Sequence, residues 1–123
     1  MSKILIVEDD TYLLKLYSEI FEKENFEVMI AEDGREALQK IQDFKPDVML
    51  LDLMLPYVDG FKVLEDVKKN PTTAATKVVV LTNLDSETQK QKALKLGAEK
   101  FMVKSSNNPD FLVDLVKKVI TPE

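Results

Sequence analysis

The chain lacks histidine, cysteine and tryptophan, and it contains a single arginine, Arg35, among its 123 residues. Without cysteine and histidine it cannot form a disulfide framework or a Cys/His zinc site. The Ser-His and Cys-His forms of nucleophilic catalysis are excluded for the same reason. A metal bound by this chain must therefore be a hard cation with oxygen ligands, such as Mg²⁺, Mn²⁺ or Ca²⁺.

Basic charge is also scarce, since 17 lysines and arginines face 22 acidic residues and leave a net charge of -5. Nucleic-acid binding relies on a basic surface, so the composition argues against it. No apolar run approaches the roughly 18 residues of a membrane span. The run at 4–7 is too short for a signal-peptide core and ends at three acidic residues. These features predict a soluble cytoplasmic protein with no membrane contact, made of one domain over residues 1–123.

Short apolar runs recur along the chain without alternating polar and apolar residues. They lie at residues 4–7, 28–31, 48–51, 78–81 and 101–103. Continuous runs of this kind indicate strands buried on both faces of a parallel sheet, and the stretches between them have a helical apolar period. The order predicts a doubly wound (βα)5 α/β fold, a flavodoxin-like three-layer sandwich with five strands in the order 2-1-3-4-5.

Several polar residues mark helix ends. Asp10 and Asp59 directly precede expected helices, so we interpret them as caps or turn residues rather than ligands. Ser86 with Gln89 is typical of a capping box, and Gly97 is typical of a helix carboxyl terminus.

Ionisable or hydroxyl side chains follow every apolar run. The second run ends at Glu32 and Asp33 on the expected outer edge of the sheet, whereas the other four end at Glu8 and Asp9, Asp52, Thr82, and Lys104. Parallel sheets bind ligands at the carboxyl ends of their strands. If the first and third strands are neighbours, about 4.8 Å apart, their carboxylates crowd together and favour a divalent cation such as Mg²⁺. A hydroxyl and an ammonium beside Asp52 suit the stabilisation of a phosphoryl group, and a carboxylate is a plausible acceptor for one.

Four segments, in this order, carry a resemblance to a known family: IVEDD at 6–10, LLDLMLPYVDG at 50–60, VLTN at 80–83 and FMVKSS at 101–106. With them the chain resembles a receiver domain of two-component response regulators, of the chemotaxis-regulator type, over essentially its whole length. The resemblance implies that Asp52 is the phosphoacceptor and that Asp9 and Asp52 bind Mg²⁺, with Mn²⁺ as a substitute. It also implies that Glu8 acts through a metal-bound water and that Met54 contributes its backbone carbonyl.

The resemblance further implies that Thr82 and Lys104 contact the bound phosphoryl group. Phe101 is either an aromatic switch coupled to Thr82 or an ordinary core residue. The resemblance implies that the phosphoryl donor is a sensor histidine kinase or a histidine phosphotransfer protein. Because this chain has no histidine, a phosphohistidine donor must be another molecule. Modification would change the face of the fourth helix, fifth strand and fifth helix for an output partner, and a homodimer is compatible with this scheme. The chain would not turn over an outside substrate.

Other functional classes stay open. A pseudo-receiver would act as an interaction module without phosphorylation, although it would be expected to lack part of the acidic cluster or the lysine. An aspartate-nucleophile phosphohydrolase usually has a second aspartate two residues after the nucleophile, where this chain has Met54. A flavin-binding protein of the same topology needs a phosphate-binding loop after the first strand, where Glu8, Asp9 and Asp10 would repel phosphate.

The chain departs from the family pattern at several positions. Ser105 replaces the proline that usually follows the lysine, which predicts a trans Lys104–Ser105 peptide. Asn83 is larger than the usual small residue and would narrow access to the phosphoryl group. Met54 and Leu84 are apolar, and we hypothesise that they shield the phosphoryl group from water.

Two helices carry further expectations. The first has a wide apolar arc, in which Leu13 or Leu14 belongs either to a broad buried face or to a docking margin, with docking slightly favoured. The fourth is mostly polar and is therefore a candidate two-state element.

Overall fold

The computed structural model describes residues 1–84, 86–106 and 108–121. Five strands form one sheet: β1 (Lys3–Val7), β2 (Glu27–Ala31), β3 (Val48–Leu51), β4 (Lys77–Thr82) and β5 (Lys100–Val103). The helices are α1 (Thr11–Lys23), α2 (Gly34–Phe44), α3 (Gly60–Lys69), α4 (Glu87–Lys95) and α5 (Pro109–Ile120). A short 3₁₀ turn, η1 (Lys104–Ser106), follows β5.

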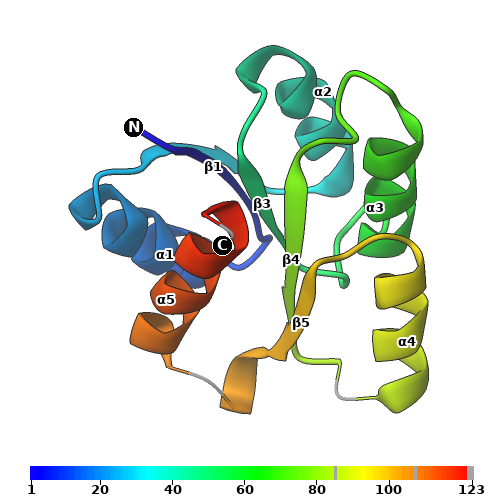
Figure 1. The fold of residues 1–123 in the computed structure, drawn as a ribbon. Coiled ribbons are helices and arrows are strands. Elements are labelled where there is room, and N and C mark those ends of the chain that lie inside the picture. Colours follow the sequence, from blue (N-terminus) through cyan, green and yellow to red (C-terminus); the bar gives the residue numbers. More distant parts are fainter. Residues whose placement is uncertain (85, 107, 122–123) are drawn as a thin grey trace.

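The strands pair in parallel in the order β2-β1-β3-β4-β5, which confirms the predicted topology. Successive residues of a strand point to opposite faces, so the sheet carries two cores. Leu5, Met49 and Val78 lie in the core that α2, α3 and α4 cover. Ile4 and Val48 lie in the core beneath α1 and α5. Figure 1 shows these two helical layers on either side of the sheet.

The predicted caps are present at the helix ends. Oδ1 of Asp10 accepts two backbone N–H groups in the first turn of α1, at 2.9 and 3.1 Å. Oδ1 of Asp59 caps α3 by accepting the N–H of Lys62 at 3.1 Å. Ser86 accepts the N–H of Gln89 at 3.4 Å. The reciprocal half of this capping box does not form, because the side-chain oxygen of Gln89 is buried without a hydrogen-bond partner. Gly97 follows α4 with a φ of 112°, a conformation that favours glycine.

The apolar arc of α1 is buried at Leu14, Tyr17 and Phe21, and half-buried at Leu13, Leu16 and Ile20. Leu14 is only 5% exposed and belongs to the core between α1 and the sheet. Leu13 is half-buried and packs against the same core. The docking interpretation of Leu14 was therefore wrong, because this side chain points inward with Tyr17 and Phe21.

The remaining expectations about the backbone are met. The Lys104–Ser105 peptide is trans, and the chain continues into η1. Helix α4 buries one residue, Ala93, in agreement with its polar sequence. Within the described ranges, every helix is too short or too polar to cross a membrane.

Candidate functional site

The site lies where β1 and β3 end. Val7 pairs with Leu51, and the N–H of Asp52 donates to the carbonyl of Val7 at 3.1 Å. This extra hydrogen bond extends the ladder by one residue and brings Glu8 beside Asp52. One carboxylate oxygen each from Glu8, Asp9 and Asp52 lies within 4.8 Å of the others. Glu8 and Asp52 are buried, whereas Asp9 is exposed.

Lys104 joins the two buried carboxylates. Because Val103 pairs with Thr82 at the end of β4, Lys104 leaves the sheet at the same edge. Its Nζ atom lies 2.8 Å from Oδ2 of Asp52 and 2.5 Å from Oε1 of Glu8. The lysine side chain is only 10% exposed. The sequence predicted Lys104 near Asp52, but it did not predict the contact with Glu8.

Backbone N–H groups hold the second oxygen of each buried carboxylate. The N–H of Met54 donates to Oδ1 of Asp52 at 3.0 Å, and the N–H of Asp10 donates to Oε2 of Glu8 at 3.1 Å. Both carboxylates therefore have one oxygen on an ammonium and one on the backbone. This arrangement fixes their orientation and satisfies them in a buried setting.

Burial and pairing act in opposite directions on the two ionisable partners. Burial raises the pKa of Glu8, although the hydrogen bond from Lys104 partly offsets this effect. Burial alone would lower the pKa of Lys104, but its hydrogen bonds to Asp52 and Glu8 prevail and raise it. Lys104 is therefore a permanent cation at neutral pH, held against Asp52.

Thr82 and Phe101 share one face of the sheet. Val80 pairs with Phe101, and Thr82 lies two residues further along β4 on the same side. Thr82 is fully buried, and its Oγ1 accepts the N–H of Leu84 at 3.3 Å. Phe101 is half-buried and packs on the core beneath α4. Phe101 thus packs against the core on the same face as Thr82, and its role as a switch stays a prediction.

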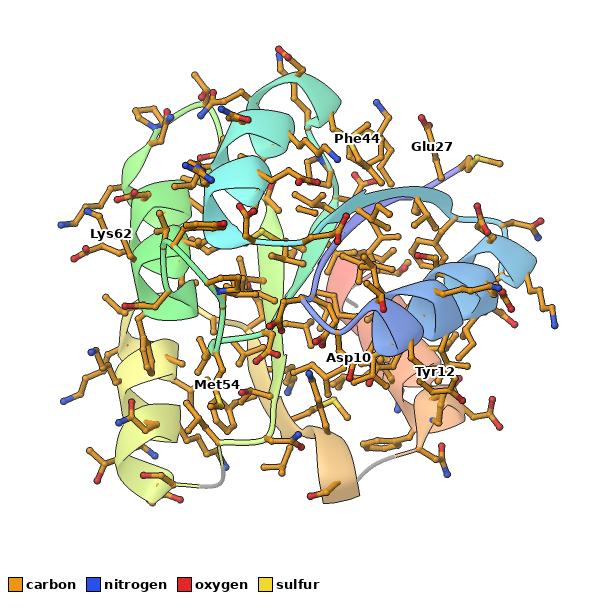
Figure 2. The ribbon with its side chains drawn as sticks, turned by 180° about the vertical axis from the view of Figure 1, so that it is seen from behind. Asp10, Tyr12, Glu27, Phe44, Met54 and Lys62 are labelled. Atoms are coloured by element: carbon orange, nitrogen blue, oxygen red, sulfur yellow. The ribbon has the colours of Figure 1, made fainter. Side chains whose placement is uncertain are left out.

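The rim of the site contains three of the residues that depart from the family pattern. Met54 is 57% exposed, Asn83 is exposed and Leu84 is half-buried. Figure 2 shows Asp10 and Met54 at one end of the sheet, and Phe44 at the opposite end. The Met54 side chain thus lies at the edge that carries the carboxylates.

Gly60 is a supporting residue that sequence reasoning missed. A Cβ atom at this position would lie 2.4 Å from Cα of Leu53 and 2.5 Å from the carbonyl oxygen of Asp52. The N–H of Gly60 also donates to the carbonyl of Leu53 at 2.9 Å. Only glycine allows α3 to begin this close to the backbone of Asp52. The Asp-Gly pair before an apolar helix was the available signal.

Comparison with known proteins places this architecture among relatives. The sequence matches the family described as response regulator receiver domain over residues 4–117. It is 37% identical over 112 residues to the transcriptional regulatory protein CpxR of Escherichia coli K12, covering 91% of this chain and 47% of CpxR. It is 36% identical over 102 residues to the alkaline phosphatase synthesis transcriptional regulatory protein PhoP of Bacillus subtilis, covering 83% of this chain and 42% of PhoP. The chain thus spans a little under half the length of these relatives.

Solved structures agree with this placement. A CheY-like receiver domain from Methanospirillum hungatei superposes with a TM-score of 0.91 at 32% identity, covering 98% of this chain and 94% of that one. The BeF3-activated receiver domain of RstA from Klebsiella pneumoniae gives a TM-score of 0.88 at 30% identity, covering 96% and 97%. The chain belongs to the receiver domain family of two-component response regulators.

Proposed function

We propose that this receiver is switched by phosphorylation of Asp52, with a phosphohistidine on a partner kinase or phosphotransfer protein as the donor. The proposal rests on the burial and the hydrogen-bond partners of Asp52. Its carboxylate is buried, with Oδ2 on the Lys104 ammonium at 2.8 Å and Oδ1 on the Met54 N–H at 3.0 Å. A carboxylate held in this way is oriented for attack and has a fixed positive charge beside it.

The transfer needs little acid–base chemistry from the chain. An oxygen of Asp52 bonds to phosphorus, the P–N bond to the donor imidazole breaks, and its electron pair stays with that imidazole. The product is an acyl phosphate on Asp52. Lys104 then pairs with the new phosphoryl oxygens, and the Thr82 hydroxyl at the neighbouring strand end donates to them. No general base is required, because a carboxylate oxygen has no proton to lose when it attacks phosphorus.

The acidic cluster fits a hard divalent cation. Glu8, Asp9 and Asp52 bring carboxylate oxygens within 4.8 Å of one another, and Lys104 offsets only one of their three charges. Mg²⁺, which receiver domains bind at an acidic pocket, would be held by Asp9, Asp52, the Met54 carbonyl and, through a water, Glu8. Such an ion neutralises charge on the transferring phosphoryl group. Mn²⁺, which also takes oxygen ligands, would substitute.

The output of the switch is proposed to be the surface of α4, β5 and α5. Thr82 and Phe101 lie on the face of the sheet that α4 covers. Helix α4 is held by one buried residue, Ala93, so its packing is easily changed. A Thr82 hydroxyl drawn toward a phosphoryl group would vacate space on this face. Phe101 is the neighbouring side chain on β5 that would move into it.

Beryllofluoride, a mimic of the phosphoryl group, tests the proposal directly. Amide NMR spectra of the intact chain and of Asp52→Ala are recorded with beryllofluoride, in the presence and in the absence of Mg²⁺. We expect Mg²⁺-dependent shifts at Asp52, Thr82 and Lys104 in the intact chain, and none in Asp52→Ala. Absence of a response in the intact chain would favour the pseudo-receiver alternative, in which the fold serves only as an interaction module.

A further inference from the structure

The loop after Asp52 contains a strained turn. The N–H of Val58 donates to the carbonyl of Pro56 at 2.9 Å, which closes a three-residue turn around Tyr57. Tyr57 has a φ of 68°, in the left-handed region, and its side chain is 75% exposed. A γ-turn with positive φ at its centre is rare, and a bulky residue is disfavoured there. Such a conformation persists only where its surroundings impose it.

Arg35 contacts the ring of this strained residue. The guanidinium carbon lies 4.3 Å from the ring centroid of Tyr57, the geometry of a cation–π contact. Arg35 is the second residue of α2 and the only arginine of the chain. Its planar group can stack on an aromatic ring as a lysine cannot. The contact therefore joins the tip of this loop to the start of a different helix.

The backbone of the loop at 53–59 also packs directly against the first residues of α2 and α3. A Cβ atom at Gly34 would lie 2.1 Å from the carbonyl oxygen of Val58, so the first turn of α2 touches the loop backbone. At the other end, Gly60 packs against the backbone of Asp52 and Leu53. The loop at 53–59 is thus held at its base by two glycines and at its tip by the stack of Arg35 on Tyr57.

We propose that Arg35, through its stack on Tyr57, positions the loop that carries Met54. The N–H of Met54 orients the Asp52 carboxylate, and its carbonyl is the Mg²⁺ ligand assigned under the proposed function, on which this inference rests. Arg35 is a positioning residue, because its contact is with Tyr57. Its loss would remove the side-chain contact at the tip of the strained turn, and the Met54 backbone would sample other positions.

If Arg35 acts by positioning the loop, its loss changes Mg²⁺ affinity in the opposite direction from the loss of its positive charge alone. Removing a positive charge near an acidic cluster strengthens cation binding through space. Loss of positioning weakens it instead. We expect Arg35→Gln and Tyr57→Leu each to weaken Mg²⁺ binding by about two- to fivefold, measured by isothermal titration calorimetry. The double variant should be no weaker than either single one, and Tyr57→Phe, which keeps the ring, should bind like the parent.

A matched control is available at the opposite end of the strands, where β1 begins. Nζ of Lys3 lies 5.3 Å from the ring centroid of Phe44, so Lys3→Gln also removes a cation–π contact and one positive charge. This variant should bind Mg²⁺ at least as tightly as the parent. The inference is overturned if Arg35→Gln binds Mg²⁺ as tightly as the parent, or more tightly.

Hydrogen exchange without Mg²⁺ tests the positioning independently of the metal. The Met54 amide should exchange faster in Arg35→Gln and Tyr57→Leu, and at the parental rate in Tyr57→Phe and Lys3→Gln. Unchanged exchange in the first two variants would contradict the inference alone. Failure of the proposed function gives a different result. The parent itself would then show no Mg²⁺ binding, or binding that Asp9→Asn does not weaken.

Discussion

Lys104 and Asp52 form a buried ion pair, with Nζ 2.8 Å from Oδ2 and side-chain exposures of 10% and 6%. The same ammonium contacts Glu8, so one cation serves two buried carboxylates. Breaking such a group leaves buried charges without a partner, which costs far more than breaking an exposed pair. In the unmodified protein Lys104 thus stabilises the fold, and in the proposed switch it pairs with the phosphoryl group.

Lys104→Met should destabilise the chain strongly. It leaves Glu8 and Asp52 as adjacent buried carboxylates, and we expect a loss of about 3 kcal/mol in the free energy of unfolding. Mg²⁺ should restore more stability to this variant than to the parent, because it replaces the missing positive charge. Urea denaturation with and without Mg²⁺ measures both effects. In Lys69→Met, which removes an exposed pair with Glu65, stability should hardly change. Equal losses in the two variants would refute this account of the buried pair.

Gly60→Ala tests how closely α3 approaches the phosphoacceptor. The new Cβ atom would collide with the backbone of Leu53 and Asp52, and neither can move without shifting the site. We expect a loss of about 1–3 kcal/mol in the free energy of unfolding, together with weaker binding of Mg²⁺. Chemical denaturation and calorimetry check the two parts. Parental stability would mean that the contact relaxes at no cost.

Met54→Asn and Leu84→Glu test the shielding hypothesis. Both parental side chains are apolar and lie near the proposed phosphoryl site, Met54 at the rim and Leu84 half-buried. A polar replacement should admit an attacking water and accelerate phosphate loss. The acceleration should stay below roughly a hundredfold, because that is the contribution of a well-positioned general base, which these replacements do not provide. Timed loss of the phosphoryl group measures this rate. Ile30→Asn on β2, also partly exposed, is the control. Lifetimes equal to that of the parent in both rim variants would count against shielding.

Gln89→Met addresses the stability of α4. The side-chain oxygen of Gln89 is buried without a partner, and such an orphan acceptor costs about 1–3 kcal/mol. An apolar replacement of similar length should remove part of this cost and slow hydrogen exchange in α4. Gln91→Met is the matched control, because Gln91 is exposed and bonds to Glu87. A Gln89→Met variant in which α4 exchanges faster than in the parent would contradict this account of the buried oxygen.

Much of this architecture follows from local sequence patterns. Continuous apolar runs such as 78–81 identify buried parallel strands, and Asp10 and Asp59 act locally as caps, so their roles depend on few distant contacts. The proximity of Glu8 to Asp52 follows from strand order alone. These features are short-range or fixed by topology, which is why the sequence predicts them.

Other features depend on three-dimensional packing. The apolar arc of α1 did not reveal that Leu14 points inward, because that depends on how the helix is rotated on the sheet. The contact of Lys104 with Glu8 joins residues that follow β5 and β1, two strands that are not neighbours in the sheet. The positive φ of Tyr57 and its stack on Arg35 arise from how a loop sits on a helix. Residue spacing contains no signal for such relationships.

Acetyl phosphate, a small phosphoryl donor, shows directly whether Asp52 is the phosphoacceptor. The intact chain and Asp52→Asn are incubated with acetyl phosphate, with and without Mg²⁺, and the modified residue is identified by mass spectrometry of the intact protein and its peptides. We expect one phosphoryl group on Asp52, formed only with Mg²⁺ and absent from Asp52→Asn. An intact chain that stays unmodified with Mg²⁺, or that is modified at another residue, would contradict this expectation.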